Sequence, residues 1–307
     1  MAVFEQKYVG VIGASGLVGQ SLLPLMVNAG YVVHAFSRQA INTCQEHANS
    51  KIIWHRLLDP IRTDEKIITK WICLAPIWAL PEYFSMFREH SAKHIVAVSS
   101  TSRFTKASSK DEAEKELAKK IADSEQWLVN WADENKIRWT ILRPTLIYRF
   151  GYDKNISVIA SFIRRFSFFP LLGEAKGLRQ PVHAQDVAFA CIEALNSEKT
   201  INNAYNISGG ETLTYREMVE RVFLKLAKKP RFVILPVGIF RVALLLLSFL
   251  PSFRNWSPAM AERMNQDLVF DHQDAKNDFG FAPRKFEFLQ DDLCVSSKFD
   301  EKGILLK

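Results

Sequence analysis

Three glycines stand three residues apart near the N-terminus, in the run Gly-Ala-Ser-Gly-Leu-Val-Gly that starts at Gly13. Small residues let a backbone turn tightly and approach a phosphate, and the free N–H groups at a helix start favour negative charge. The chemistry that this spacing serves is the binding of a pyrophosphate; the alternative is a glycine-rich turn without a ligand. The predicted contact residues are Gly13, Ser15, Gly16, Leu17, Val18 and Gly19.

The segments around this loop form a complete βαβ pattern. An apolar run over Tyr8–Ile12 predicts a strand, leucines at helical spacing follow from Leu17, and Gly30 stands where a left-handed C-cap is needed before a second strand, Tyr31–Phe36. A glycine loop between a strand and a helix is typical of dinucleotide binding. We therefore predict that the loop holds NAD(H) or NADP(H).

The end of the second strand favours NADP(H). An NAD site usually has an acidic residue there for the ribose hydroxyls, but this strand ends in Ser37 and Arg38, and the next acid is Glu46. A hydroxyl and a guanidinium suit a 2′-phosphate. NAD stays open, as does a purely solvated Arg38. Ala75, at the end of another predicted strand, completes the predicted cofactor site.

Alternating strands and helices predict an α/β fold, a Rossmann-type doubly wound parallel sheet with a smaller C-terminal substrate lobe. The remaining strands are expected at Ile52–His55, Trp71–Ala75, His94–Val98, Trp139–Leu142 and Ala204–Ile207. We assign residues 1–147 to the NAD(P)-binding core. Residues 148–307 return to the core at about 182–210 and otherwise form the substrate lobe. Helices are expected to be capped by Ser109 with Glu112, by Thr214 with Glu217, and by Asp186 before Val187–Leu195.

Several further motifs resemble the NAD-dependent epimerase/dehydratase group of the extended or atypical short-chain dehydrogenases/reductases. They are Val98-Ser99-Ser100-Thr101, Leu142-Arg143-Pro144 with Leu146-Ile147-Tyr148, the run Arg179 to Ala188, and Tyr205-Asn206-Ile207-Ser208-Gly209-Gly210-Glu211. The resemblance implies that Ser100 takes the place of the active-site Ser/Thr that bonds the substrate oxygen, with Thr101 and Ser102 as near alternatives. These hydroxyls would otherwise only cap the strand end.

The group's acid/base pair, a Tyr followed four residues later by Lys, is missing. Aligned on Ala122-Asp123-Ser124-Glu125, the two positions fall near Leu117 and Ile121, and no tyrosine lies between Tyr83 and Tyr148. Tyr148 is the candidate replacement for the acid/base tyrosine, and Tyr152 is the alternative. Tyr148 could instead be a packing residue. Arg149 replaces the glycine of the group's usual Tyr-Gly pair.

The resemblance also assigns substrate contacts to the run that begins at Arg179. Arg179 would pair with a substrate phosphate, and His183 would bind substrate or be a hydrogen-bonded structural residue.

Composition limits the remaining function classes. The chain of 307 residues is 48% hydrophobic and 24% charged, which is typical of a globular protein. Its net charge of +7 favours anionic partners, but the lysines alternate with acids and no nucleic-acid module is visible. Scattered cysteines and histidines predict reduced thiols and no metal, and the N-terminus predicts no signal peptide and hence a cytoplasmic protein.

An apolar stretch over Phe232–Leu250 is interrupted by Arg241. It predicts a packed or subunit-facing helix, while a helix in the membrane interface remains an alternative and a spanning helix is disfavoured. A peripheral membrane contact and a homodimer therefore stay open.

The leading hypothesis for function is an NADP(H)-dependent oxidoreductase or epimerase acting on a hydroxyl or carbonyl of a sugar-like or other small substrate. The alternatives are a non-catalytic NADP(H)-binding sensor or assembly protein, and a membrane-peripheral enzyme acting on a lipid-linked substrate.

Overall fold

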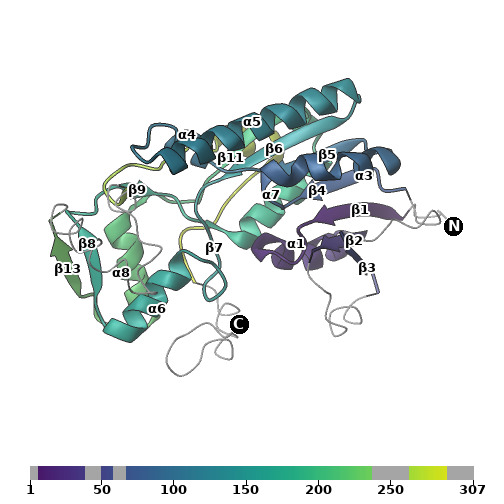
Figure 1. Cartoon of the computed structure of the whole chain (residues 1–307). Helices are drawn as coiled ribbons and strands as arrows, with labels where there is room; N and C mark the ends of the chain where they lie inside the picture. The colour runs from purple at the N-terminus through teal and green to yellow at the C-terminus, as the bar shows by residue number, and fades with distance from the viewer. Residues whose placement is uncertain (1–5, 39–49, 58–66, 237–262, 289–307) are drawn as a thin grey trace.

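The computed structural model describes residues 6–38, 50–57, 67–236 and 263–288, and its centre is a sheet of seven parallel strands (Figure 1). The strand order is β11-β6-β5-β4-β1-β2-β3. The strands are β1 (Lys7–Ile12), β2 (Tyr31–Ser37), β3 (Ile52–Arg56), β4 (Lys70–Cys73), β5 (His94–Val98), β6 (Arg138–Pro144) and β11 (Asn203–Ile207). The predicted fold class and the existence of all seven strands are confirmed.

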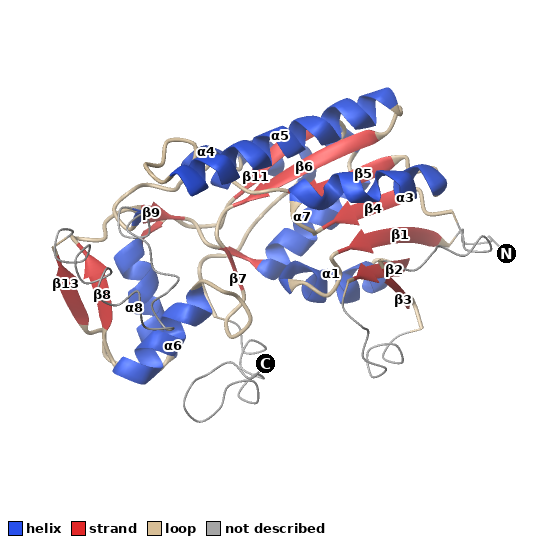
Figure 2. Cartoon of the chain, in the orientation of Figure 1, coloured by secondary structure: helices blue, strands red, loops and turns tan. Residues whose placement is uncertain are grey.

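Helices cover both faces of this sheet (Figure 2). Helices α1 (Leu17–Asn28) and α7 (Ala184–Asn196) pack together on one face, against Val11, Ile72 and Val96. The other face packs against η1 (Ile77–Tyr83), α3 (Phe84–Glu89) and α5 (Glu112–Glu134). Successive strand residues therefore belong to different cores, as the two-residue period of a strand requires.

A second layer of structure lies beyond the carboxyl ends of the strands and has its own apolar core. Its principal elements are α6 (Ile156–Phe166), β8 (Phe169–Leu172), α8 (Tyr215–Lys225) and β13 (Phe232–Leu235). The shorter elements are α4 (Ser102–Thr105), β7 (Ile147–Tyr148), β9 (Leu178–Arg179), β10 (Val182–His183), η2 (Glu198–Thr200), β12 (Leu213–Thr214) and α11 (Gln273–Phe279). The chain thus leaves the sheet after β6 and returns to it through α7 and β11.

The apolar stretch begins as a strand, which corrects part of the sequence interpretation. Phe232–Leu235 forms β13 and pairs in parallel with β8, because β-branched and aromatic residues favour a strand. Residues 237–250 of the predicted helix lie outside the described residues. Within the described part of the chain, no helix is both long and apolar enough to cross a membrane.

Two predicted helix starts are wrong. Helix α5 begins at Glu112 after Asp111, whose carboxylate accepts from the Ala113 N–H at 2.9 Å, while the Ser109 hydroxyl bonds to Glu114 instead. Helix α7 begins at Ala184, and His183 is its cap.

The other two predicted helix ends are confirmed. Thr214 and Glu217 form a complete capping box on α8. Gly30 has a left-handed backbone conformation, with φ of +87°, just after α1, as a glycine at the end of a helix often does.

Two histidines are buried in the sheet in their neutral form. His34 stacks on His55, and burial lowers its pKa to about 4, helped by the nearby charges of His55 and His90. Burial also lowers the pKa of His94 to about 4, with Lys70 and Arg138 acting in the same direction; its ring bonds to the Thr140 hydroxyl at 3.0 Å.

The protein should lose stability as the pH falls from about 6.5 to about 4, because the unfolded histidines take up protons that the folded ones do not. Replacing His94→Gln removes one such group and retains a partner for Thr140. We expect the slope of unfolding free energy against pH to fall by up to about 1.4 kcal/mol per pH unit in this window. Urea unfolding at several pH values measures it, and parallel slopes for the two proteins would contradict the prediction.

Candidate functional site

The glycine loop follows β1, the strand at which the order of the strands in the sheet reverses. Strand β1 pairs with β2 on one side and with β4 on the other, and ligands of doubly wound sheets bind at such a switch point. Gly13 has φ of +78°, and its N–H bonds to the Phe36 carbonyl at 3.1 Å. A Cβ on Gly13 would lie 2.8 Å from the Ala75 nitrogen, and one on Gly19 would overlap the Ala14 carbonyl. These two glycines are therefore required by close backbone packing.

Gly16 differs because it is exposed. A Cβ there would meet only the Gly13 carbonyl oxygen, at 3.2 Å. Gly16 is the N-cap of α1 and supplies no side-chain hydrogen bond, so the N–H groups of the first turn, from Leu17 to Gly19, remain available to a ligand. A loop that is open on its ligand side and ends in uncapped N–H groups fits a pyrophosphate.

The carboxyl ends of β2 and β3 form the adjoining edge. The Ser37 hydroxyl is buried and lies 2.9 Å from the Ser15 hydroxyl, so it joins the glycine loop to β2. Arg38 is exposed beyond Ser37. Arg56 ends β3 opposite Ser37 in the register of the parallel pair and is also exposed. Sequence reasoning identified Arg38 and missed Arg56, since only the strand register brings the two arginines to one edge.

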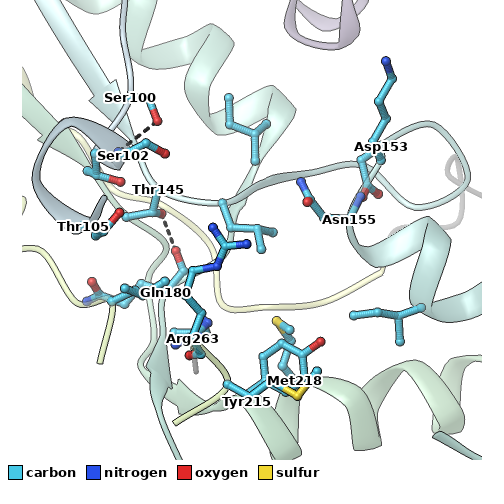
Figure 3. A pocket seen from close by; sticks show the side chains of 18 of the residues that line it. Ser100, Ser102, Thr105, Thr145, Asp153, Asn155, Gln180, Tyr215, Met218 and Arg263 are labelled. Carbon is cyan, nitrogen blue, oxygen red and sulfur yellow. Dashed lines mark hydrogen bonds between the residues drawn. The ribbon is translucent and has the colours of Figure 1, made fainter. Parts of the chain in front are cut away.

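A cavity of about 650 Å³ runs from the first turn of α1 into the second layer. Leu17 and the hydroxyl side chains of Ser100, Ser102, Thr105 and Thr145 line its sheet side, and Figure 3 shows these hydroxyls gathered together. Its other walls include Asn155, Val158, Phe162, Phe169, Arg179, Tyr215, Met218, Arg263, Met264 and Phe270. The volume lies in the ordinary range for small-molecule sites.

Ser100 lies two residues beyond the end of β5 and lines this cavity. Its Oγ accepts a hydrogen bond from the Ser102 N–H at 3.1 Å, at the start of α4. The nearby Thr101 also lines the cavity, but its hydroxyl donates to the Pro144 carbonyl at 3.2 Å. The structure thus brings Ser100 and Leu17 of the glycine loop to the same cavity.

A buried carboxylate fixes the strand end that carries Ser100. Glu125, on α5, is 2% exposed. It accepts from the Ser99 hydroxyl at 2.5 Å, from the Arg143 guanidinium at 2.7 Å, and from Arg103. These partners come from β6, α4 and the residue after β5, so one carboxylate on α5 connects three other parts of the fold around the candidate catalytic serine.

The helix face that would carry the Tyr/Lys pair is apolar. Leu117 packs against the core, and Ile121 belongs to it with 2% exposure. Tyr148 is 1% exposed, and its hydroxyl donates to the Glu287 carbonyl at 3.0 Å, while the Glu287 N–H donates back at 3.2 Å. Tyr148 does not line the cavity. This placement favours the packing role over proton exchange.

The two predicted substrate residues lie in different environments. Arg179 lines the cavity, but its guanidinium donates to the carbonyls of Leu178 and Gln266 at 2.7 Å and to that of Arg263. Burial lowers its pKa to about 10. His183 is buried outside the cavity lining, and its Nδ1 accepts from the Gln185 N–H at 3.2 Å. For His183 this contact fits the structural role that was the stated alternative, and Arg179 combines bonds to backbone carbonyls with a place in the cavity wall.

Asp186 does not cap a helix. Its carboxylate accepts from the Arg284 side chain at 2.8 Å and from the Arg284 N–H at 3.1 Å. It was mistaken for a cap because the partner is 98 residues away in sequence. For the same reason no local pattern indicated that residues 263–270 line the cavity.

Metal chemistry has no support among the residues that the structure describes. No group of three or more His, Cys, Asp or Glu side chains is placed there to hold an ion. Cys73 and Cys191 are buried free thiols, and burial raises the pKa of each to about 12.

Comparison with known proteins supports the resemblance read from the sequence. A model of the NAD dependent epimerase/dehydratase family matches residues 84–208. Over 101 residues the chain is 30% identical to an NADH dehydrogenase [ubiquinone] 1 alpha subcomplex subunit 9 of Arabidopsis thaliana, a stretch covering 33% of this chain and 25% of the relative. A divinyl chlorophyllide a 8-vinyl-reductase of Cucumis sativus is 26% identical over 161 residues, or 52% and 36% of the two chains. The chain therefore spans between a quarter and little more than a third of the length of these curated relatives.

Solved structures share the fold over most of their length. A UDP-glucose 4-epimerase of Thermotoga maritima, solved with UDP-glucose, has a TM-score of 0.61 at 15% identity, covering 90% of this chain and 93% of that one. A dTDP-glucose 4,6-dehydratase of Bacillus anthracis, in complex with NAD, has a TM-score of 0.62 at 14% identity, covering 90% and 91%. These structures show that the fold is shared, and the family match over residues 84–208 supports the resemblance to the epimerase/dehydratase group.

Replacing Glu125→Ala should destabilise the protein by about 3 kcal/mol, because two guanidinium groups and a hydroxyl lose a buried partner. The matched control is Glu116→Ala on the exposed face of the same helix, where we expect a change of about 0.5 kcal/mol or less. Chemical unfolding measures both. Equal effects of the two substitutions would show that the Glu125 cluster does not hold this part of the fold.

Proposed function

Because residues 84–208 match the NAD dependent epimerase/dehydratase family and the fold agrees, we propose that this chain is an NADP(H)-dependent oxidoreductase or epimerase. Its substrate is a small molecule that reacts at a hydroxyl or carbonyl group. The observation that carries the proposal is the continuity of the cavity, which is lined both by Leu17 of the glycine loop and by Ser100. A cofactor on the loop and a substrate in the cavity would therefore be neighbours.

The residues present fit such a cofactor. The open side of Gly16 and the uncapped start of α1 would hold the pyrophosphate, and Ala75, beside Gly13, would line the same crevice. A bound nicotinamide supplies hydride exchange with a carbon atom of the substrate. Ser100 would donate a hydrogen bond to the substrate oxygen, with its own Oγ held by the Ser102 N–H.

NADP(H) is proposed over NAD(H) because of charge at the carboxyl ends of β2 and β3. Arg38 and Arg56 are exposed at the same edge, next to the buried Ser37, and β2 ends without the acidic residue that would bond a free ribose. Guanidinium groups bind phosphate oxygens in pairs of hydrogen bonds. The edge therefore suits a 2′-phosphate.

The cavity also favours an anionic substrate. Lys106 and Arg263 both line it and pair with the same carboxylate, that of Glu114; the Lys106–Glu114 distance is 3.5 Å. Arg179 adds a third cation, bonded to carbonyls. One carboxylate between two cations leaves positive charge for a ligand phosphate or carboxylate.

Titration with NADPH and NADH by fluorescence tests the cofactor assignment. NADPH should bind more tightly, and Arg38→Ala should weaken NADPH binding about tenfold while leaving NADH binding nearly unchanged, because only NADPH carries the 2′-phosphate. Arg88→Ala, an exposed arginine on α3, is the control. Equal affinities for both nucleotides would refute the NADP(H) preference, and failure of both to bind would refute the whole proposal.

Ser100→Ala tests the proposed catalytic contact. With NADPH and a panel of carbonyl compounds and nucleotide sugars, we expect kcat to fall about 100-fold, because a hydrogen bond to the reacting oxygen is lost, while NADPH affinity is retained. Ser85→Ala, an exposed serine on α3 outside the cavity lining, is the control. Tight NADPH binding without turnover by the unmodified protein would instead favour the non-catalytic sensor.

A further inference from the structure

We propose that the cavity is built for an anionic amphiphile, a molecule that joins a phosphate or carboxylate to an extended apolar body, and not for a sugar nucleotide. This inference rests on the proposed function, since it concerns the substrate of the same site. It follows from how polar and apolar groups are distributed over the walls.

The wall formed by the second layer is largely apolar. Helix α6 contributes Val158, Ile159 and Phe162, β8 contributes Phe169, and α8 contributes Met218. Met264, Leu268 and Phe270 continue this surface. Val158 is 51% exposed, so the apolar surface reaches the mouth of the cavity. Flexible methionines and aromatic rings suit a hydrocarbon or ring system, which gains about 0.8 kcal/mol for each buried methylene group.

Many polar groups of the lining already have protein partners. The Gln180 amide oxygen accepts from the Phe270 N–H at 2.7 Å, and the Thr145 hydroxyl donates to the Gln180 carbonyl. Asp153 accepts from the N–H groups at the start of α6, at 2.6 Å from Ile156. A nucleobase and a sugar carry many donors and acceptors, each of which must find a partner when buried. Outside the sheet-side hydroxyls and the cations, the polar groups left to such a ligand are those of Lys154, Asn155 and Tyr215 and the Gln180 amide nitrogen.

Cations mark where the anionic group lies. Lys106 follows α4, close to Ser102 and Thr105. Lys106 and Arg263 both form ion pairs with the carboxylate of Glu114. Tyr215 on α8 belongs to the other wall and is neutral, because burial raises its pKa to about 12. Figure 3 shows Tyr215 and Met218 on the opposite side of the cavity from the Ser100 hydroxyl. The anion would thus bind on the sheet side and the apolar body along α6 and α8.

Calorimetric titration of the full chain, with and without NADPH, tests the inference. The probes are decyl phosphate below its critical micelle concentration, ethyl phosphate and UDP-glucose. Decyl phosphate should bind at least about tenfold more tightly than either of the others, because only it buries a chain along the apolar wall.

Val158→Gln locates the binding site without emptying the core, because this side chain is already half exposed. It should weaken decyl phosphate binding about threefold or more and leave the affinities for NADPH and ethyl phosphate unchanged. Phe189→Gln, an exposed apolar residue on α7 away from the cavity lining, is the matched control. Lys106→Gln should weaken the binding of decyl phosphate and of ethyl phosphate to a similar extent.

Three results would overturn the inference: equal affinity for decyl and ethyl phosphate, tighter binding of UDP-glucose, or equal losses for Val158→Gln and the Phe189→Gln control. NADPH binding is read separately in each titration. A protein that binds NADPH but not decyl phosphate would refute the amphiphile and leave the proposed function standing.

Discussion

The buried charge of Glu125 is the constraint on which the candidate site depends. A carboxylate that is 2% exposed loses several kcal/mol of hydration, and only well-placed cations and donors compensate for the loss. Arg143 on β6, Arg103 on α4 and Ser99 after β5 provide these contacts. Because the carboxylate must keep all three partners, the segment between β5 and α4 has little freedom. Ser100 lies in that segment, so its position follows from the electrostatics of a residue that does not line the cavity.

A comparable set of contacts attaches the second layer to the sheet. Asp186 at the start of α7 holds Arg284, and the Tyr148 hydroxyl bonds to both backbone groups of Glu287. Arg179 holds two carbonyls of residues 263–266. Each contact joins residues more than 80 positions apart in sequence, and each satisfies a buried polar group that would otherwise be costly. The cavity lies between two apolar cores whose separation these contacts fix.

The sequence predicted those features that neighbouring residues determine. Strand positions follow from apolar runs, and the glycine loop was recognised because its three glycines meet local demands: a left-handed backbone at Gly13, contact with Ala14 at Gly19, and an open face at Gly16. Errors arose where a distant partner competed for a side chain. Ser109 and Asp186 both resemble helix caps, but each bonds elsewhere. The walls from Arg263 to Phe270 had no local signal, because their place depends on packing across the whole fold.

The missing Tyr/Lys pair changes how the proposed chemistry must handle a proton. On α5, Leu117 and Ile121 pack in an apolar core, so neither of these two positions supplies a group that can exchange a proton. Tyr148 is bonded to the backbone, and Tyr215, with a pKa of about 12, holds its proton firmly. Under the proposed function, the oxygen of the substrate would therefore exchange its proton with the hydroxyls beside Ser100. Serine and threonine hydroxyls are weak acids, so such a site suits a reaction in which the substrate itself, or water bound to those hydroxyls, carries much of the proton transfer.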